Sequence, residues 1–476
     1  MTPAGPHHAY ARPVRGPDRS AMRSASEMID TADSEVLSIP ALPLRRREQV
    51  RAAALAIFRR QNPGNCDALL DLPAREWKHL LHWLDISGLA LYLLDRLTEL
   101  DLLTALPAQI HQRLAQNLRD NAARTSALMQ ECLAIQRGFA AFDVRFALLK
   151  GFSLCPHSVP RLELRSQLDL DFLVHAADEV RAQYVLEGRG YRLHGISGRS
   201  REFKTPYAGA LILENLYKPS PQLTVEIHLE PKESELLTRS TQLSLGDVSI
   251  PVLPAPELFA GQALHLFKHL SRDQMRCSHM LELYRHLLTR YNDTAFWSHV
   301  QEACAAEPRK LLGLGLALEF VSQQMDPSCL PDSVRSWTTD RLPLPARLWV
   351  RRYGTRVATA GFPGTKLYLL LQDALSSPQG PFDPAIRSQL IPRRLPPAIA
   401  IPPMDEDVPQ QLLRGIRQAR FIFLRLRYHT REGIRYLVER RRWRLLMRSA
   451  PGSNGGAVSR DLKALCAGSS QTATKP

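Results

Sequence analysis

Two aspartates separated by a single residue carry the clearest chemical signal in the chain. They lie in the run LDLDFLV at residues 168–174, where apolar and acidic residues alternate. Alternation predicts a β-strand on which Asp169 and Asp171 share one face. Neighbouring carboxylates repel each other unless a cation lies between them, and hard oxygen ligands suit Mg²⁺ or Mn²⁺. The run therefore predicts a divalent-metal site. The plainer alternative, a solvent-facing strand of an ordinary sheet, fits less well because acidic residues are disfavoured in strands.

A third carboxylate follows in a second alternating run, LTVEIHL at residues 223–229. Thr224, Glu226 and His228 share one face of this predicted strand. If the strand lies beside the first, Glu226 completes a cluster of three carboxylates. Such a cluster can hold metal ions that align an attacking oxygen with a nucleoside triphosphate.

The elements around these runs predict a mixed α/β core. Residues 146–149 form an apolar run before Gly151, residues 176–188 are predicted to form a helix that ends at a glycine, and residues 209–217 are predicted to form a strand paired with 222–230. This order differs from that of a doubly wound nucleotide-binding sheet. Neither G-x-G-x-x-G nor G-x-x-x-x-G-K-[ST] occurs, so the sequence lacks the usual dinucleotide and P-loop motifs.

Four motifs occur in an order typical of a known family. They are LKGFSL at 149–154, RSQLDLDFLV at 165–174, Gly190-Tyr191, and VEIH at 225–228. With these motifs the chain resembles the uncharacterised bacterial nucleotidyltransferase family, which is part of the polymerase-beta-like nucleotidyltransferase superfamily. The resemblance extends more weakly from about residue 45 to about residue 300.

The resemblance implies an α+β fold, with a small mixed-sheet nucleotidyltransferase core flanked by N-terminal and C-terminal helical regions. It implies transfer of a nucleoside monophosphate from an NTP to an acceptor hydroxyl, dependent on Mg²⁺ or Mn²⁺. Asp169, Asp171 and Glu226 would be the catalytic residues and the metal ligands. The acceptor is left open between a small molecule, a protein and RNA. The alternative is a non-catalytic scaffold or binding protein that retains the fold.

The same resemblance implies nucleotide-binding roles for residues near the first motif. Gly151 would let a phosphate approach the backbone at a helix start. Ser153 lies on the same turn. Lys150 or Arg165 would neutralise phosphate charge.

Composition sets wider bounds on the protein. The chain has 476 residues and 44% hydrophobic residues, enough for a sizeable core and two or three domains. The net charge of +15 can attract nucleic acid, anionic lipid or triphosphate, but we favour a general arginine-rich composition as its origin. Seven irregularly spaced cysteines without a C-x-x-C pair argue against a disulfide framework and a structural zinc site. The absence of a long apolar run and of a secretory signal predicts a cytoplasmic location.

Composition also divides the chain into seven expected segments. These are a disordered lead-in (1–40), a helical N-terminal region (41–140), the nucleotidyltransferase core (141–250), a helical region (251–330), a proline-rich connector on the surface (331–409), basic helices (410–449) and a disordered tail (450–476).

Two further patterns each allow a functional and a structural interpretation. His265 and His269 lie four residues apart on a predicted helix, with Cys277 and His279 following. This spacing permits a zinc site, but no H-E-x-x-H acid is present and helix packing is favoured. Residues 410–449 interleave arginines with aromatic residues, which suits a nucleic-acid or membrane-surface contact. An amphipathic helix with solvated arginines is favoured there.

Overall fold

The computed structural model describes residues 43–60, 66–207, 213–230, 235–273, 275–375, 389–390 and 408–449. The expected disordered segments, 1–40 and 450–476, lie outside the described residues.

A mixed sheet of seven strands forms within the described part of the chain, in the order β3-β4-β5-β2-β1-β7-β6. The strands are β1 (Phe146–Leu149), β2 (Leu170–His175), β3 (Arg192–Ser197), β4 (Ser200–Lys204), β5 (Thr224–Glu230), β6 (Thr241–Leu245) and β7 (Val248–Val252). Strand β2 is antiparallel to β1 and parallel to β5, and β4 is antiparallel to both β3 and β5. Strand β1 runs parallel to β7, which pairs antiparallel with β6.

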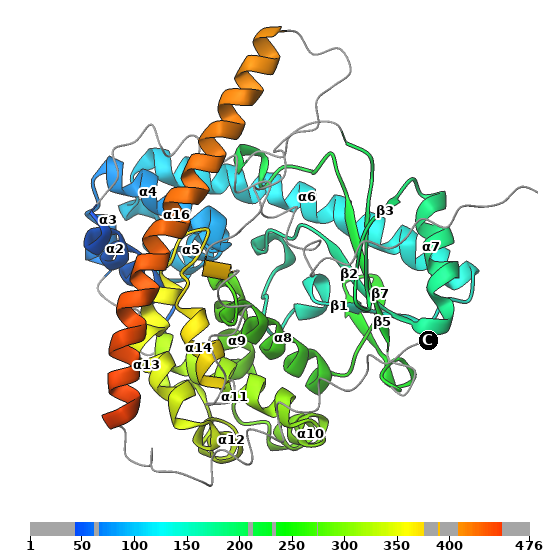
Figure 1. Cartoon of the computed structure of the whole chain (residues 1–476). Coiled ribbons are helices and arrows are strands. Elements are labelled where there is room, and N and C mark those ends of the chain that lie inside the picture. The colour runs from blue at the N-terminus through cyan, green and yellow to red at the C-terminus, as the bar shows by residue number, and fades with distance from the viewer. Residues whose placement is uncertain are drawn as a thin grey trace, which may run out of the picture.

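Alternation in β2 assigns its two faces to different partners. Leu170, Phe172 and Val174 are buried in a hydrophobic cluster with residues of helices α6 (Ala108–Ala141) and α7 (Glu179–Gly188). The opposite face carries Asp171 and Leu173. Figure 1 shows α6 and α7 beside the sheet on the right of the molecule. One face of the sheet is thus a core, and the other is free to carry polar groups.

The N-terminal helices form the other half of the molecule together with the helices that follow the sheet. The first set is α2 (Leu44–Ala56), α3 (Asp67–Leu70), α4 (Ala74–Ser87) and α5 (Ala90–Glu99). Helix α4 ends at Gly88, whose φ of +74° lies in the left-handed region that glycine adopts readily. The long helix α6 has 34 residues and extends from this half to the sheet (Figure 1). Its Leu114 lies in the helical core, whereas Ile135 and Phe139 pack under the sheet.

The helices after the sheet complete the helical core. They are α8 (Ala255–Leu270), α9 (Cys277–Thr289), α10 (Thr294–Ala305), α11 (Pro308–Gln324), α12 (Asp332–Trp337), α13 (Leu344–Ala358) and α14 (Tyr368–Leu375). The α+β class with flanking helical regions is therefore confirmed. Among the described helices, none combines the length and the apolar character needed to cross a bilayer.

The expectation of an irregular surface connector over 331–409 is wrong for its described helices. Trp349 and Leu367 are fully buried in the same core as α4 and α5. The prolines here begin helices instead of interrupting them, because Pro331 precedes α12 and Pro343 precedes α13. Residues 391–407 lie outside the described residues.

The basic segment forms one helix, α16 (Val408–Ser449), of 42 residues. Tyr436 and Trp443 bury their rings in the helical core, and Tyr353 of α13 donates a hydrogen bond to Glu439. Figure 1 shows the first turns of α16 projecting beyond the body of the molecule.

The predicted strand at 209–217 also needs correction. Residues 209–212 lie outside the described residues, and Leu213–Asn215 form a short 3₁₀ helix. Strand β5 pairs with β4 in its place. Leu216 and Tyr217 pack into the helical core, where the hydroxyl of Tyr217 donates to Asp85 at 2.8 Å. These apolar residues therefore anchor the sheet to the helices.

Candidate active site

Two of the predicted acids lie side by side on neighbouring strands. Asp171 of β2 is opposite Glu226 of β5 in the parallel register, and both side chains are buried. Asp169 precedes β2 by one residue and is partly buried. Burial and the Asp171 carboxylate raise the pKa of Asp169 to about 6. The three predicted acids therefore lie in one electrostatically coupled cluster.

Lys150 neutralises part of this negative charge. It follows β1, and its ammonium donates to Oδ1 of Asp171 at 2.9 Å. Burial alone would lower the pKa of Lys150, but Asp171, Asp169 and Glu226 outweigh burial and raise it. The backbone of Lys150 has a φ of +53°, which is uncommon for a residue with a side chain. Its carbonyl accepts a hydrogen bond from the Ser153 hydroxyl at 2.9 Å. Ser153 thus holds the turn that presents Lys150.

Gly151 supports the site through a close contact. Its φ is +54°, and a Cβ at this position would lie 2.3 Å from Nε2 of Gln167. The same Nε2 donates to the backbone carbonyl of Asp169 at 2.8 Å. Gly151 therefore leaves space for the side chain that holds Asp169 at the start of β2.

Arg165 is held in place by the helical half. Its Nε donates to Oε1 of Glu282 at 3.2 Å, and the hydroxyl of Tyr92 donates to the same oxygen at 3.0 Å. Burial opposes the charge on Arg165, but Glu282 and the nearby acids raise its pKa. The guanidinium is thus a fixed cation near Lys150 and the acid cluster.

His228 and Ser200 belong to the site, although the sequence argument did not assign them to it. Nε2 of His228 lies 3.1 Å from Oδ1 of Asp171 and 3.6 Å from Oε2 of Glu226. The Ser200 hydroxyl donates to Glu226 and lies 3.1 Å from Nδ1 of His228. Burial would raise the pKa of Asp171, but Lys150 and His228 hold it well below its usual range. The alternation that placed His228 on the face of Glu226 was a usable signal for this histidine.

Glu202 adds a fourth carboxylate that sequence reasoning also missed. It lies opposite Glu226 in the antiparallel register of β4 and β5. Lys204 is its ion-pair partner at 3.3 Å, yet neither carboxylate oxygen has a well-directed hydrogen bond within the described residues. Burial raises the pKa of Glu202 to about 7, and Glu226 and Asp169 add to the rise while Lys204 opposes it. The alternation of Glu202 and Lys204 along β4 was the available signal.

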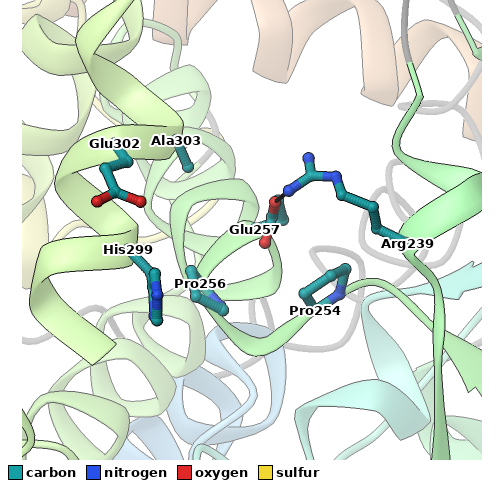
Figure 2. Close-up of a pocket in the computed structure, with 7 residues that line it drawn as sticks. All are labelled: Arg239, Pro254, Pro256, Glu257, His299, Glu302 and Ala303. Atoms are coloured by element: carbon teal, nitrogen blue, oxygen red, sulfur yellow. Dashed lines mark ion pairs between the residues drawn. The ribbon is translucent and has the colours of Figure 1, made fainter. Parts of the chain in front are cut away.

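A cleft of about 270 Å³ opens beside this cluster. The sheet side contributes Lys150 and His228, and helices α8 and α9 contribute His265, His279 and Glu282. A neighbouring groove is larger, at about 430 Å³. Figure 2 shows its residues from the start of α8, from α10 and from the segment before β6: Arg239, Pro254, Pro256, Glu257, His299, Glu302 and Ala303.

The larger groove is the weaker candidate for chemistry. Its guanidinium, Arg239, is already paired with Glu257 at 2.7 Å, as the dashed line in Figure 2 marks. The four carboxylates of the acid cluster line neither cavity, but the larger groove also lacks Lys150 and His228. The smaller cleft is therefore the candidate active site, because its walls include Lys150 and His228, which contact the acids.

The donor set at the cleft fits a divalent cation. Asp171, Glu226 and His228 each offer one ligand atom, and these atoms all lie within 4.8 Å of one another. Two buried carboxylates suit Mg²⁺ and Mn²⁺, and the imidazole nitrogen suits Mn²⁺ better than Mg²⁺. The buried oxygens of Glu202 without a directed hydrogen bond add to the demand for positive charge.

Comparisons with known proteins identify a family for this chain. The model of a family described as uncharacterised nucleotidyltransferase matches residues 73–324, more than half of the chain. No curated protein matches. The crystal structure of an antigenic nucleotidyltransferase-like protein from Paracoccidioides brasiliensis aligns over 40% of this chain and 92% of that chain, at 12% identity. Its TM-score of 0.25 is too low to support an argument. By the extent of the family match, the chain belongs to this family of uncharacterised nucleotidyltransferases.

Proposed function

We propose that this chain is a metal-dependent nucleotidyltransferase of the polymerase-beta-like kind, which transfers a nucleoside monophosphate from an NTP to an acceptor hydroxyl. The observation that carries the proposal is the pairing of Asp171 with Glu226 on adjacent parallel strands. Lys150 and His228 converge on this pair beside the cleft. Anionic ligands for a cation and cations for a triphosphate are thus present within one site.

The cation would be held by Asp169, Asp171 and Glu226, with His228 as an additional ligand. When bound, Mg²⁺ or Mn²⁺ would neutralise triphosphate charge and lower the pKa of an acceptor hydroxyl. The Lys150 ammonium now supplies positive charge to Asp171 at 2.9 Å. We expect Lys150 to leave that carboxylate and contact phosphate oxygens when substrate binds. Arg165 stays fixed by Glu282 and adds a second phosphate contact.

The reaction itself is a displacement at the α-phosphorus. A bond forms between the acceptor oxygen and the α-phosphorus, and the bond from that phosphorus to the bridging oxygen of the β-phosphate breaks. Pyrophosphate leaves with the bonding electron pair, and a carboxylate of the acid cluster accepts the proton of the hydroxyl. The acceptor is a small molecule, a protein or RNA.

Calorimetric titration tests the proposal. ATP, GTP, CTP and UTP are titrated with Mg²⁺ or Mn²⁺ into the full chain, into the Asp169→Ala, Asp171→Ala double variant, and into Asp247→Asn. Asp247 is an exposed acid on the turn between β6 and β7 and is the matched control. We expect metal-dependent binding of at least one triphosphate in the wild type and the control, and none in the double variant. Equal binding by all three proteins would overturn the assignment.

One observation favours the alternative of a non-catalytic scaffold. The Lys150 ammonium pairs with the central carboxylate, Asp171, and can neutralise it without a metal ion. A folded protein that binds none of the four triphosphates with either metal would support this alternative.

A further inference from the structure

Three histidines form a second cluster on the helical wall of the cleft. His265 and His269 lie one turn apart on α8, and His279 lies in the first turn of α9. Their ring centroids are 4.5 to 4.8 Å apart, and one ligand nitrogen from each lies within 4.8 Å of the others. His265 and His279 line the cleft that also contains Lys150. The cluster therefore faces the cleft whose walls include Lys150 and His228, the residues that contact the acids, but it consists only of imidazoles.

The state of these rings suits metal ligation. His279 is 8% exposed, and its Nδ1 has no hydrogen-bond partner among the described residues. A buried nitrogen without a partner is costly unless another group satisfies it. Burial lowers the pKa of His265 and His279 well below the usual value, and Lys150 adds to the effect on both. The rings of His265 and His279 thus favour the neutral form, in which an imidazole nitrogen offers a lone pair.

The spacing is close to what a tetrahedral cation requires. With Zn–N bonds of about 2.0–2.1 Å, two ligand nitrogens lie about 3.3 Å apart. Nε2 of His265 and Nε2 of His269 are 3.1 Å apart. Cys277, which the sequence pattern grouped with these histidines, contributes nothing to the cluster, because its thiol donates to the carbonyl of Ala358 and burial raises its pKa to about 12.

We propose that His265, His269 and His279 bind one Zn²⁺, or a similar cation that prefers imidazole, with a remaining coordination position open to the cleft. Three protein ligands and an open position are the arrangement of zinc sites that bind substrate or water. The fourth ligand would be water or an oxygen of a molecule bound in the cleft. The site differs chemically from the carboxylate cluster, and its existence does not depend on the proposed nucleotidyl transfer.

Metal titration of the full chain tests this proposal directly. The protein is treated with chelator and dialysed, then titrated with Zn²⁺ by calorimetry and with Co²⁺ by visible absorption. We expect one equivalent of tight Zn²⁺ binding and the intense absorption of tetrahedral Co²⁺. His265→Ala and His269→Ala should each weaken Zn²⁺ binding by about 100-fold or more, since losing an outer-shell partner alone costs about 10- to 100-fold.

Two controls separate this site from other ligands. His299→Ala removes an exposed histidine of α10 and should leave the titration unchanged. The Asp171→Asn, Glu226→Gln double variant should retain the tetrahedral Co²⁺ absorption, which separates the histidine site from the acid cluster. Circular dichroism confirms that each variant is folded. His265 and His269 are both only partly buried, so either variant decides the test if the other unfolds. The proposal is overturned if the folded wild type binds neither metal stoichiometrically, or if the histidine variants bind as tightly as the wild type.

Discussion

Replacing Gly151 with alanine tests how the turn after β1 positions the acid cluster. The φ of +54° at Gly151 lies in the left-handed region that side chains disfavour. An added Cβ would lie 2.3 Å from Nε2 and 2.7 Å from Oε1 of Gln167. This side chain also donates to the carbonyl of Asp169. The substitution must therefore displace the group that holds Asp169 at the start of β2.

Two penalties add in this variant. A left-handed backbone costs a residue with a side chain roughly 1–2 kcal/mol. Overpacking of a filled site typically costs about 1–3 kcal/mol. We expect Gly151→Ala to lower the free energy of unfolding by roughly 2–5 kcal/mol. Gly246 is the matched control, because its φ is +62° and an added Cβ would meet nothing within 4 Å. Gly246→Ala should incur only the backbone penalty.

Urea unfolding followed by circular dichroism measures these differences. The clash can be isolated by repeating Gly151→Ala in a Gln167→Ala background. There the substitution should cost no more than Gly246→Ala, since the partner of the clash is gone. The reasoning is refuted if Gly151→Ala and Gly246→Ala cost the same in the wild-type background. It is also refuted if the cost of Gly151→Ala is unchanged by removal of the Gln167 side chain.

Three further predictions concern the rest of the fold. Hydrogen bonds from Arg145 outweigh burial and lower the pKa of Asp178 to about 2. Asp178→Asn should therefore lower the free energy of unfolding by about 1–2 kcal/mol at pH 7. Urea titrations should show this difference from the wild type disappear as the pH falls from about 4 to about 2. Burial raises the pKa of Asp85 to about 6. The free energy of unfolding of the wild type should therefore fall by about 2 kcal/mol relative to that of Asp85→Asn as the pH rises from about 4 to about 6. A difference between the two proteins that does not change with pH would contradict this pKa assignment. Trp443→Ala should lower the free energy of unfolding by about 3–5 kcal/mol and speed amide hydrogen exchange along α16. The control Leu445→Ala, whose side chain is 56% exposed, should change neither quantity. Equal effects of the two variants would argue against the docking of α16 through Trp443.

Local patterns predicted the parts of the site that depend only on the order of residues along the chain. Alternation in 168–174 placed Leu170 and Phe172 on a buried face. It also placed Asp171 on the opposite one. The prediction from the sequence pattern was wrong for residues 331–375, because these residues pack against helices that are far away in the sequence. Prolines in this segment begin buried helices.

The sequence by itself determined the strand that carries Asp171, the strand that carries Glu226, and the family to which their motifs point. Only the tertiary structure decided that β5 lies beside β2 with Glu226 opposite Asp171, and that β4 adds Glu202. It also brought His265 and His279 to the wall of the same cleft. The physical reason is that alternation fixes which way a side chain faces within its own strand. Strand order and register depend on burial and hydrogen bonds between segments far apart in the chain.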